Sequence, residues 1–108
     1  MANTFKLKTK ANVGVTTVGI YTAPAATTTV VIGITMANTA GSGVNVGVGI
    51  TRASAEDIKL LKNAPLPQGS SLEFMAGNKV VLEATDTLTV DSDTNNSVDA
   101  ALTIMEIT

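Results

Sequence analysis

The chain has 108 residues, with seven Lys and Arg against nine Asp and Glu, no His, no Cys and only 3% aromatic residues. This length suits one domain with its own core, and the missing Cys excludes disulfides, thiolate nucleophiles and sulfur-ligated metals. Because the basic residues are scattered and stacking aromatics are few, we expect no nucleic-acid binding.

The first strand is expected near the N-terminus, where apolar and basic side chains alternate at Phe5, Lys6, Leu7, Lys8 and Lys10. Alternation places the three amines on one face of a strand, and edge lysines discourage the addition of another strand. We therefore expect an N-terminal segment over residues 1–12, acting as an edge strand or an attachment arm, and a domain over residues 13–108.

Two kinds of targeting segment are not expected. The N-terminal residues lack the apolar core that follows the basic start of a secretory signal. No run reaches the ~18 apolar residues of a membrane span. The sequence thus predicts neither secretion nor membrane association.

Residues 28–51 are predicted to form a central hairpin, because apolar side chains alternate on both sides of the turn-forming sequence ANTAGSG. The alternation predicts two core-facing sets: Val30, Ile32, Ile34 and Met36 on the first strand, and Val44, Val46, Val48 and Ile50 on the second. Gly33, Gly47 and Gly49 fall on the opposite parity. Glycine within a strand marks a bulge or a close approach of another chain, so this flat face is a candidate contact.

The second half of the chain reads as further short strands. Residues 52–57 are polar enough to start a single helical turn, residues 58–63 predict a strand, and the prolines of residues 64–69 predict an extended crossover. Strands are also predicted over residues 70–75, 79–84 and 98–107. Together these elements predict an all-β fold: a single antiparallel β-sandwich or jelly-roll-like domain of about eight strands.

The acidic residues give no convincing active site. Residues 91–99 resemble the start of a calcium loop, but Asn96 and Leu102 stand where such a loop needs glycine and glutamate, so a hairpin turn is expected. The pairs Glu56 with Asp57, Glu73 with Glu83, and Asp86 with Asp91 are interpreted as outward-facing residues on turns or strands. We expect no catalytic residue, no cofactor and no metal, and hence no enzyme.

The order of segments resembles a known class of proteins. The sequence combines an Ala-Pro turn, a Val/Ile strand ending in Ala37-Asn38-Thr39, the run Lys62-Asn63-Ala64-Pro65-Leu66-Pro67, and Val81-Leu82-Glu83-Ala84. This order is similar to that of small virion structural proteins of tailed bacteriophages, over residues 13–107. The resemblance implies a β-sandwich attached to a virion, as a capsid decoration or cement protein or as a tail or neck subunit, made in the cytoplasm of a bacterial host.

The low charge density fits a protein that buries a contact surface as well as a core. The expected partners are the major capsid protein, or tail and neck proteins, and further copies of the chain, with a trimer favoured. The candidate contact residues are Phe5, Lys6, Leu7, Lys8, Gly33, Gly47 and Gly49. A receptor- or glycan-binding module is the remaining alternative, although the chain offers only Phe5, Tyr21 and Phe74 as aromatic platforms, and at least two of these are expected in the core.

Overall fold

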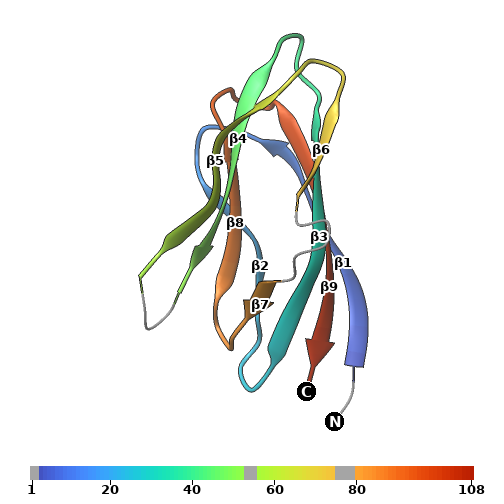
Figure 1. Ribbon diagram of the computed structural model, residues 1–108, viewed down its shortest axis with the longest axis vertical. Coiled ribbons are helices and arrows are strands. Elements are labelled where there is room, and N and C mark those ends of the chain that lie inside the picture. The colour runs from blue at the N-terminus through green and yellow to red at the C-terminus, as the bar shows by residue number, and fades with distance from the viewer. Residues whose placement is uncertain (1–2, 53–55, 75–79) are drawn as a thin grey trace.

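The computed structural model describes residues 3–52, 56–74 and 80–108, without the side chain of Phe74 (Figure 1). These residues form nine strands and no helix: β1 (Asn3–Val13), β2 (Val18–Thr22), β3 (Thr28–Asn38), β4 (Val44–Thr51), β5 (Ile58–Leu66), β6 (Ser71–Phe74), β7 (Val80–Leu82), β8 (Thr87–Ser92) and β9 (Val98–Ile107). The predicted short helical turn near residues 52–57 includes residues 53–55, which lie outside the described residues.

The strands form two antiparallel sheets that face each other. The larger sheet has the order β1-β9-β3-β6, with β7 also paired to β3, and the smaller sheet has the order β2-β8-β4-β5. Figure 1 shows the two sheets as the layers of a sandwich, with both chain ends at the same end of the molecule. The predicted all-β sandwich is therefore confirmed, with nine strands described where about eight were expected.

The predicted hairpin over residues 28–51 is wrong, because β3 lies in the larger sheet and β4 in the smaller one. The link between them crosses the sandwich, and the buried side chain of Asn38 holds it. Its Nδ2 donates to the carbonyls of Ser42 and Leu66, both at 2.9 Å, and its Oδ1 accepts from the amide of Ala40. A loop bound in this way leads the chain to the opposite layer and not back along β3.

The face assignment on the first strand of that segment also needs correction. The β3–β9 register shifts between Val31 and Gly33, so Ile32 is an extra residue, as in a β-bulge. The bulge reverses the parity: Val31 is fully buried before it and Ile34 after it, while Val30 and Ile32 are half-buried. The assignments of Ile34, Met36 and the four β4 residues to the core are confirmed.

The expected hairpin turn at residues 91–97 is likewise a crossing between layers, from β8 in the smaller sheet to β9 in the larger. The buried hydroxyls of Ser92 and Ser97 hydrogen-bond to each other. Their amides donate to the carbonyls of Gly14 and Val13 respectively. These bonds fasten the turn to the end of β1 and the start of the link that follows it. The turn is not a hairpin, because β8 and β9 lie in different sheets.

The core fills the space between the sheets, where both inner faces contribute aliphatic side chains. The largest fully buried ones are Ile34, Met36, Leu66, Leu82, Leu88, Leu102, Ile104 and five valines. Tyr21 is buried with them, whereas Phe5 is 68% exposed. β5 runs on through Pro65 to Leu66, which an edge strand tolerates because the missing N–H can face away from the sheet.

Candidate interaction surface

The outer face of the larger sheet carries a row of apolar side chains across four strands. In the register of the sheet, Phe5 of β1 lies opposite Met105 of β9, Met105 opposite Val30 of β3, and Val30 opposite Val81 of β7. Residues that oppose one another in an antiparallel ladder point to the same side of the sheet. The four side chains thus form a continuous apolar stripe on the side away from the core.

This surface is both exposed and nearly free of charge. Phe5, Leu7 and Val81 are 68%, 65% and 54% exposed, and they make up most of the exposed large apolar residues that the structure describes. Leu7 continues the stripe toward Thr103 and Gly33 in the next row. The charged residues of this side, Glu73 and Asp99, lie toward the far end of the sheet, opposite Thr35 and Ala37.

An exposed apolar surface on a small domain usually marks a site of contact with another protein, since isolated apolar residues are common but contiguous ones are not. We call this surface, defined by Phe5, Leu7, Val30, Val81, Thr103, Met105 and Gly33, the outer face. Of the three glycines that the sequence assigned to a flat, uncharged face, only Gly33 lies on the outer face; Gly47 and Gly49 lie on β4 of the smaller sheet.

β1 forms one edge of the larger sheet and contributes little to the core. Of its eleven residues, only Val13 is buried and only Lys8 is half-buried. Lys6, Lys8 and Lys10 lie opposite Ile104, Leu102 and Ala100, which are core-facing, so the amines are on the inner side of the sheet. Inward-pointing lysines on an edge strand hinder the pairing of further strands.

One lysine of β1 reaches a buried acid. Lys6 Nζ lies 2.9 Å from Glu106 Oε1, whose side chain is 9% exposed. The hydroxyl of Tyr21 donates to Glu106 Oε2 at 2.6 Å and lies 2.8 Å from Thr29 Oγ1. Four strands, β1, β9, β2 and β3, therefore meet in this polar cluster, which joins the edge strand to both layers of the sandwich.

The cluster shifts two pKa values. The hydrogen bond from Tyr21, followed by that from Lys6, holds the pKa of Glu106 below its ordinary value. Burial, reinforced by the hydrogen bond to Glu106, raises the pKa of Tyr21 to about 12. At neutral pH the carboxylate is therefore ionised and the phenol is neutral, which is the state that lets Tyr21 donate and Lys6 pair with the same acid.

Gly47 and Gly49 are placed differently from Gly33. Both are buried on β4, and an added Cβ at Gly47 would come 2.5 Å from Asp91 Oδ1, while one at Gly49 would come 2.8 Å from the carbonyl of Ile58. An ion pair between Lys59 and Asp91, at 3.7 Å, lies over this part of the smaller sheet. The two glycines thus allow close approach within the sheet, whereas Gly33 meets open space on the outer face. The predicted subunit contact at all three stays a prediction.

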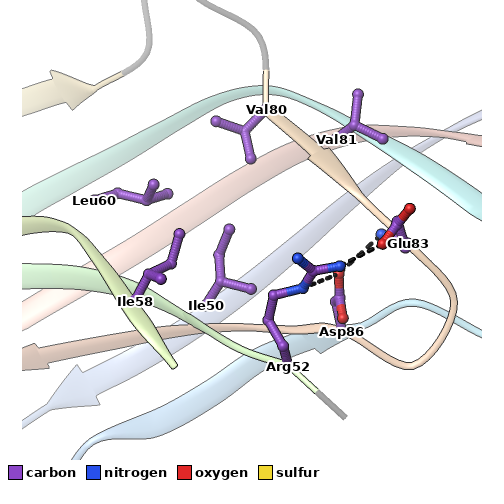
Figure 2. Close-up of a pocket in the computed structure, with 8 residues that line it drawn as sticks. All are labelled: Ile50, Arg52, Ile58, Leu60, Val80, Val81, Glu83 and Asp86. Atoms are coloured by element: carbon purple, nitrogen blue, oxygen red, sulfur yellow. Dashed lines mark hydrogen bonds and ion pairs between the residues drawn. The ribbon is translucent and has the colours of Figure 1, made fainter. Parts of the chain in front are cut away.

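An open cleft of about 490 Å³ lies between the two layers near β4, β5 and β7 (Figure 2). Its apolar walls include Ile50, Ile58, Leu60 and Val80. Figure 2 shows the guanidinium of Arg52 pointing at Glu83 and Asp86, and its Nε lies 3.2 Å from Asp86 Oδ2.

The charged residues that line this cleft are therefore paired with one another. These ion pairs, led by the hydrogen bond with Asp86, raise the pKa of Arg52 above its ordinary value. The sequence suggested that Asp86 faces outward, but the structure buries it. Its Oδ2 also accepts a hydrogen bond from the amide of Glu83, which closes the turn before β8.

Within residues 3–52, 56–74 and 80–108, no cluster of three or more potential metal ligands is present. The described residues also include no helix long and apolar enough to cross a membrane. The features that bring side chains together here are thus the outer face, the polar cluster of Glu106, and the cleft at Arg52.

Sequence reasoning did not identify Glu106 or Val81 as important. The signal for Glu106 was present, because it is the one charged residue on the core-facing parity of the strand that contains Leu102 and Ile104. Val81 carried no such signal, since its place beside Val30 depends on a pairing between strands about fifty positions apart.

Comparison with known proteins gives likeness of structure alone. No protein-family model matches the chain, and a search of curated proteins finds no match. A chain from Bacillus endospore appendages, described as a novel family of disulfide-linked pili, superposes with a TM-score of 0.60 at 13% identity, covering 99% of this chain and 87% of that one. A chain from the acidic stable capsid structure of Helicobacter pylori bacteriophage KHP30 gives a TM-score of 0.60 at 9% identity, covering 100% of this chain and 94% of that one. At such identities the likeness shows a shared β-sandwich fold over nearly the whole of each chain.

Proposed function

We propose that this protein is a non-enzymatic structural subunit of a bacteriophage virion, and that it decorates the outer surface of the head as a cement protein. The observation that carries the proposal is the outer face: a contiguous apolar surface, built from four strands, on a domain whose described residues include no group of three or more potential metal ligands. A protein that acts by attachment needs such a surface and needs no reactive group.

Three further observations support this proposal. The segment order resembles that of phage virion proteins, and the fold is shared with a chain from a phage capsid structure. The low charge density, with 15% of residues charged, is also suited to a subunit that covers part of its surface by assembly. Repetition on a symmetric particle then multiplies a contact that is weak for one copy.

The proposed partner of the outer face is the major capsid protein. Phe5 and Leu7 would contact it from β1 and Gly33 from β3, while Lys6 and Lys8 stay on the inner side of the sheet. A homotrimer at a threefold position of the head is the proposed assembly. In that arrangement each copy supplies the same stripe to a neighbouring surface of the particle.

Counting copies in the purified particle tests the location. We expect occupancy in the hundreds, at symmetry positions of the capsid, in images of the virion. A count near six or twelve would overturn the cement role and favour a subunit of the tail or neck. Binding of the isolated protein to intact host cells, with no density on the head, would favour a receptor-binding module.

A binding experiment tests the surface. Purified protein is added to particles stripped of it, and the retained amount is compared between the unchanged chain and a Val81→Lys variant, which places an amine in the stripe. Val15→Lys is the matched control, because Val15 is 56% exposed but lies in the link between β1 and β2. We expect at least tenfold weaker retention for Val81→Lys alone; equal loss in both variants, or in neither, would contradict attachment through the outer face.

A further inference from the structure

We propose that β1 is an exchangeable strand: residues 3–10 of one copy can leave their own β9 and pair with β9 of a second copy. The inference concerns contacts between copies of this chain and holds for the isolated protein, whether or not the protein belongs to a virion. It rests on how β1 is held, on where the chain can bend, and on how far the released strand reaches.

The strand is held mainly by backbone bonds and by one ion pair. Residues 3–10 pair with residues 100–107 of β9 in an unbroken register, but none of these eight residues is buried. Releasing these residues therefore exposes little additional apolar surface on their side chains. Burial of apolar surface is the contribution that stabilises most strands in a core. The contact between Lys6 and Glu106 is the one side-chain ion pair that the structure records for β1.

The pairing of β1 with β9 becomes irregular directly after these residues. The β1–β9 register breaks between Lys10 and Val13, and Asn12 has a φ of 58°, in the left-handed region that non-glycine residues rarely adopt. Val13 beyond the break is buried, and its carbonyl accepts the amide of Ser97. Exchange therefore requires a bend at residues 11–12 and loss of the hydrogen bond from the Asn12 amide to Asp99 Oδ1, while Val13 stays fixed in the sandwich.

The acceptor is the edge of β9 that the strand leaves behind. It keeps its other partner, β3, and it displays Glu106 together with the core-facing residues Leu102 and Ile104. The β1 of a second copy pairs with this edge in the same register. It makes the same ion pair and the same Phe5–Met105 contact as in its own monomer. Since every contact is reproduced, exchange is opposed chiefly by the entropy of association, as in other strand swaps.

The released strand is long enough to reach a neighbour. Eight residues in extended form span about 26 Å at about 3.3 Å per residue. The molecule measures 45 × 25 × 22 Å, so two copies packed side by side along their long axes lie within that reach. Such packing also raises the local concentration of the second copy, which favours exchange over the closed monomer.

The lysines argue against the simpler alternative, in which two intact copies pair their β1 edges about a twofold axis. Antiparallel pairing brings residues of the same parity face to face, so Lys6, Lys8 and Lys10 of both copies would crowd one side of the joint sheet. Like charges directly opposite one another destabilise such a pair. In the exchanged form the partner of Lys6 is instead the carboxylate of Glu106.

Engineered thiols test the exchange, because the natural chain has no Cys. Leu7 and Thr103 lie opposite each other, at a spacing that a disulfide can span, and a copy with Leu7→Cys is mixed with a mass-tagged copy carrying Thr103→Cys. The control mixture pairs Leu7→Cys with Thr28→Cys, whose site is also exposed but lies on β3, with β9 between it and β1. Mild oxidation is followed on a non-reducing gel.

We expect the Leu7/Thr103 mixture to give at least five times more disulfide-linked heterodimer than the control, increasing with protein concentration. Lys6→Met, introduced into the Leu7→Cys copy, is expected to increase the rate of linkage several-fold, while Lys8→Met is not. A heterodimer yield equal to the control at millimolar protein would overturn the exchange. The double variant Leu7→Cys/Thr103→Cys, oxidised when dilute, checks the geometry, because it must form the internal disulfide in a monomer.

Discussion

Lys6 Nζ lies 2.9 Å from Glu106 Oε1, and through this pair an edge strand with little burial is joined to a buried acid. Glu106 in turn accepts from Tyr21, which belongs to the opposite sheet. A buried carboxylate is destabilising unless its oxygens are hydrogen-bonded or paired. Here both oxygens are, so the acid serves as the point at which the N-terminal strand is fixed to the sandwich.

Replacing Lys6 with Met tests that role. The variant keeps most of the aliphatic side chain but removes the charge, and we expect the backbone amides of β1 to exchange with solvent three to ten times faster. The free energy of unfolding should fall by only about 0.5–1 kcal/mol, since Lys6 is 42% exposed and the pair is partly solvated. Lys8→Met is the control; equal acceleration in both variants would show that Glu106 does not hold the strand.

Tyr21 gives the cluster a measurable dependence on alkaline pH. Its pKa is raised to about 12 in the folded protein, so the unfolded chain, with a pKa near 10, loses its proton first. Stability from this group is therefore fully present below pH 10 and is lost as the pH rises toward 12.

Tyr21→Phe removes the titrating group and leaves one oxygen of Glu106 without its donor. We expect about 1–3 kcal/mol lower stability at pH 8. The further decrease between pH 9 and pH 11.5, measured by denaturant unfolding, should be smaller than in the unchanged protein. An identical alkaline slope in both proteins would mean that Tyr21 is not protected in the folded state.

The bulge at Ile32 makes two adjacent residues respond differently to the same change. Val31 is fully buried against the smaller sheet, while Val30 is half-buried on the outer face. Val31→Asp should prevent folding, because an unpaired buried carboxylate costs several kcal/mol against a total stability of about 5–15. Val30→Asp should remain folded and unfold cooperatively in thermal melts. An unfolded Val30→Asp together with a folded Val31→Asp would instead support the simple alternation that assigned Val30 to the core.

Local patterns predicted the strands well because alternation and turn residues depend on neighbours in sequence. The strand at residues 98–107 followed from such patterns, as did the core role of Val46, while the strand predicted over residues 58–63 extends in the structure to Leu66. The pairing of strands did not, because the same ANTAGSG sequence suits a hairpin turn and a crossing between sheets. Bonds to residues distant in sequence decide between them, among them the bond of Asn38 to Leu66, which is 28 positions away.

The candidate surface was predictable only in part. Phe5 and Leu7 were visible as apolar residues alternating with lysines, and a flat uncharged face was expected beside the glycines. Its position was not predictable, since one extra residue at Ile32 exchanges the two faces of β3. Gly47 and Gly49 looked like Gly33 in sequence, but the neighbouring strands of their own sheet lie close over them.

Gly49 and Gly33 should respond differently to the same substitution. A Cβ at Gly49 would come 2.8 Å from the carbonyl oxygen of Ile58, which is backbone and cannot turn aside, whereas a Cβ at Gly33 meets nothing within 4 Å. Gly49→Ala should therefore lower the free energy of unfolding by about 1–3 kcal/mol, because β4 and β5 must move apart. Gly33→Ala should be neutral or slightly stabilising, since alanine limits the unfolded chain more than glycine does. Thermal unfolding of the two variants decides the matter, and a larger loss in Gly33→Ala would contradict the close approach of β4 and β5.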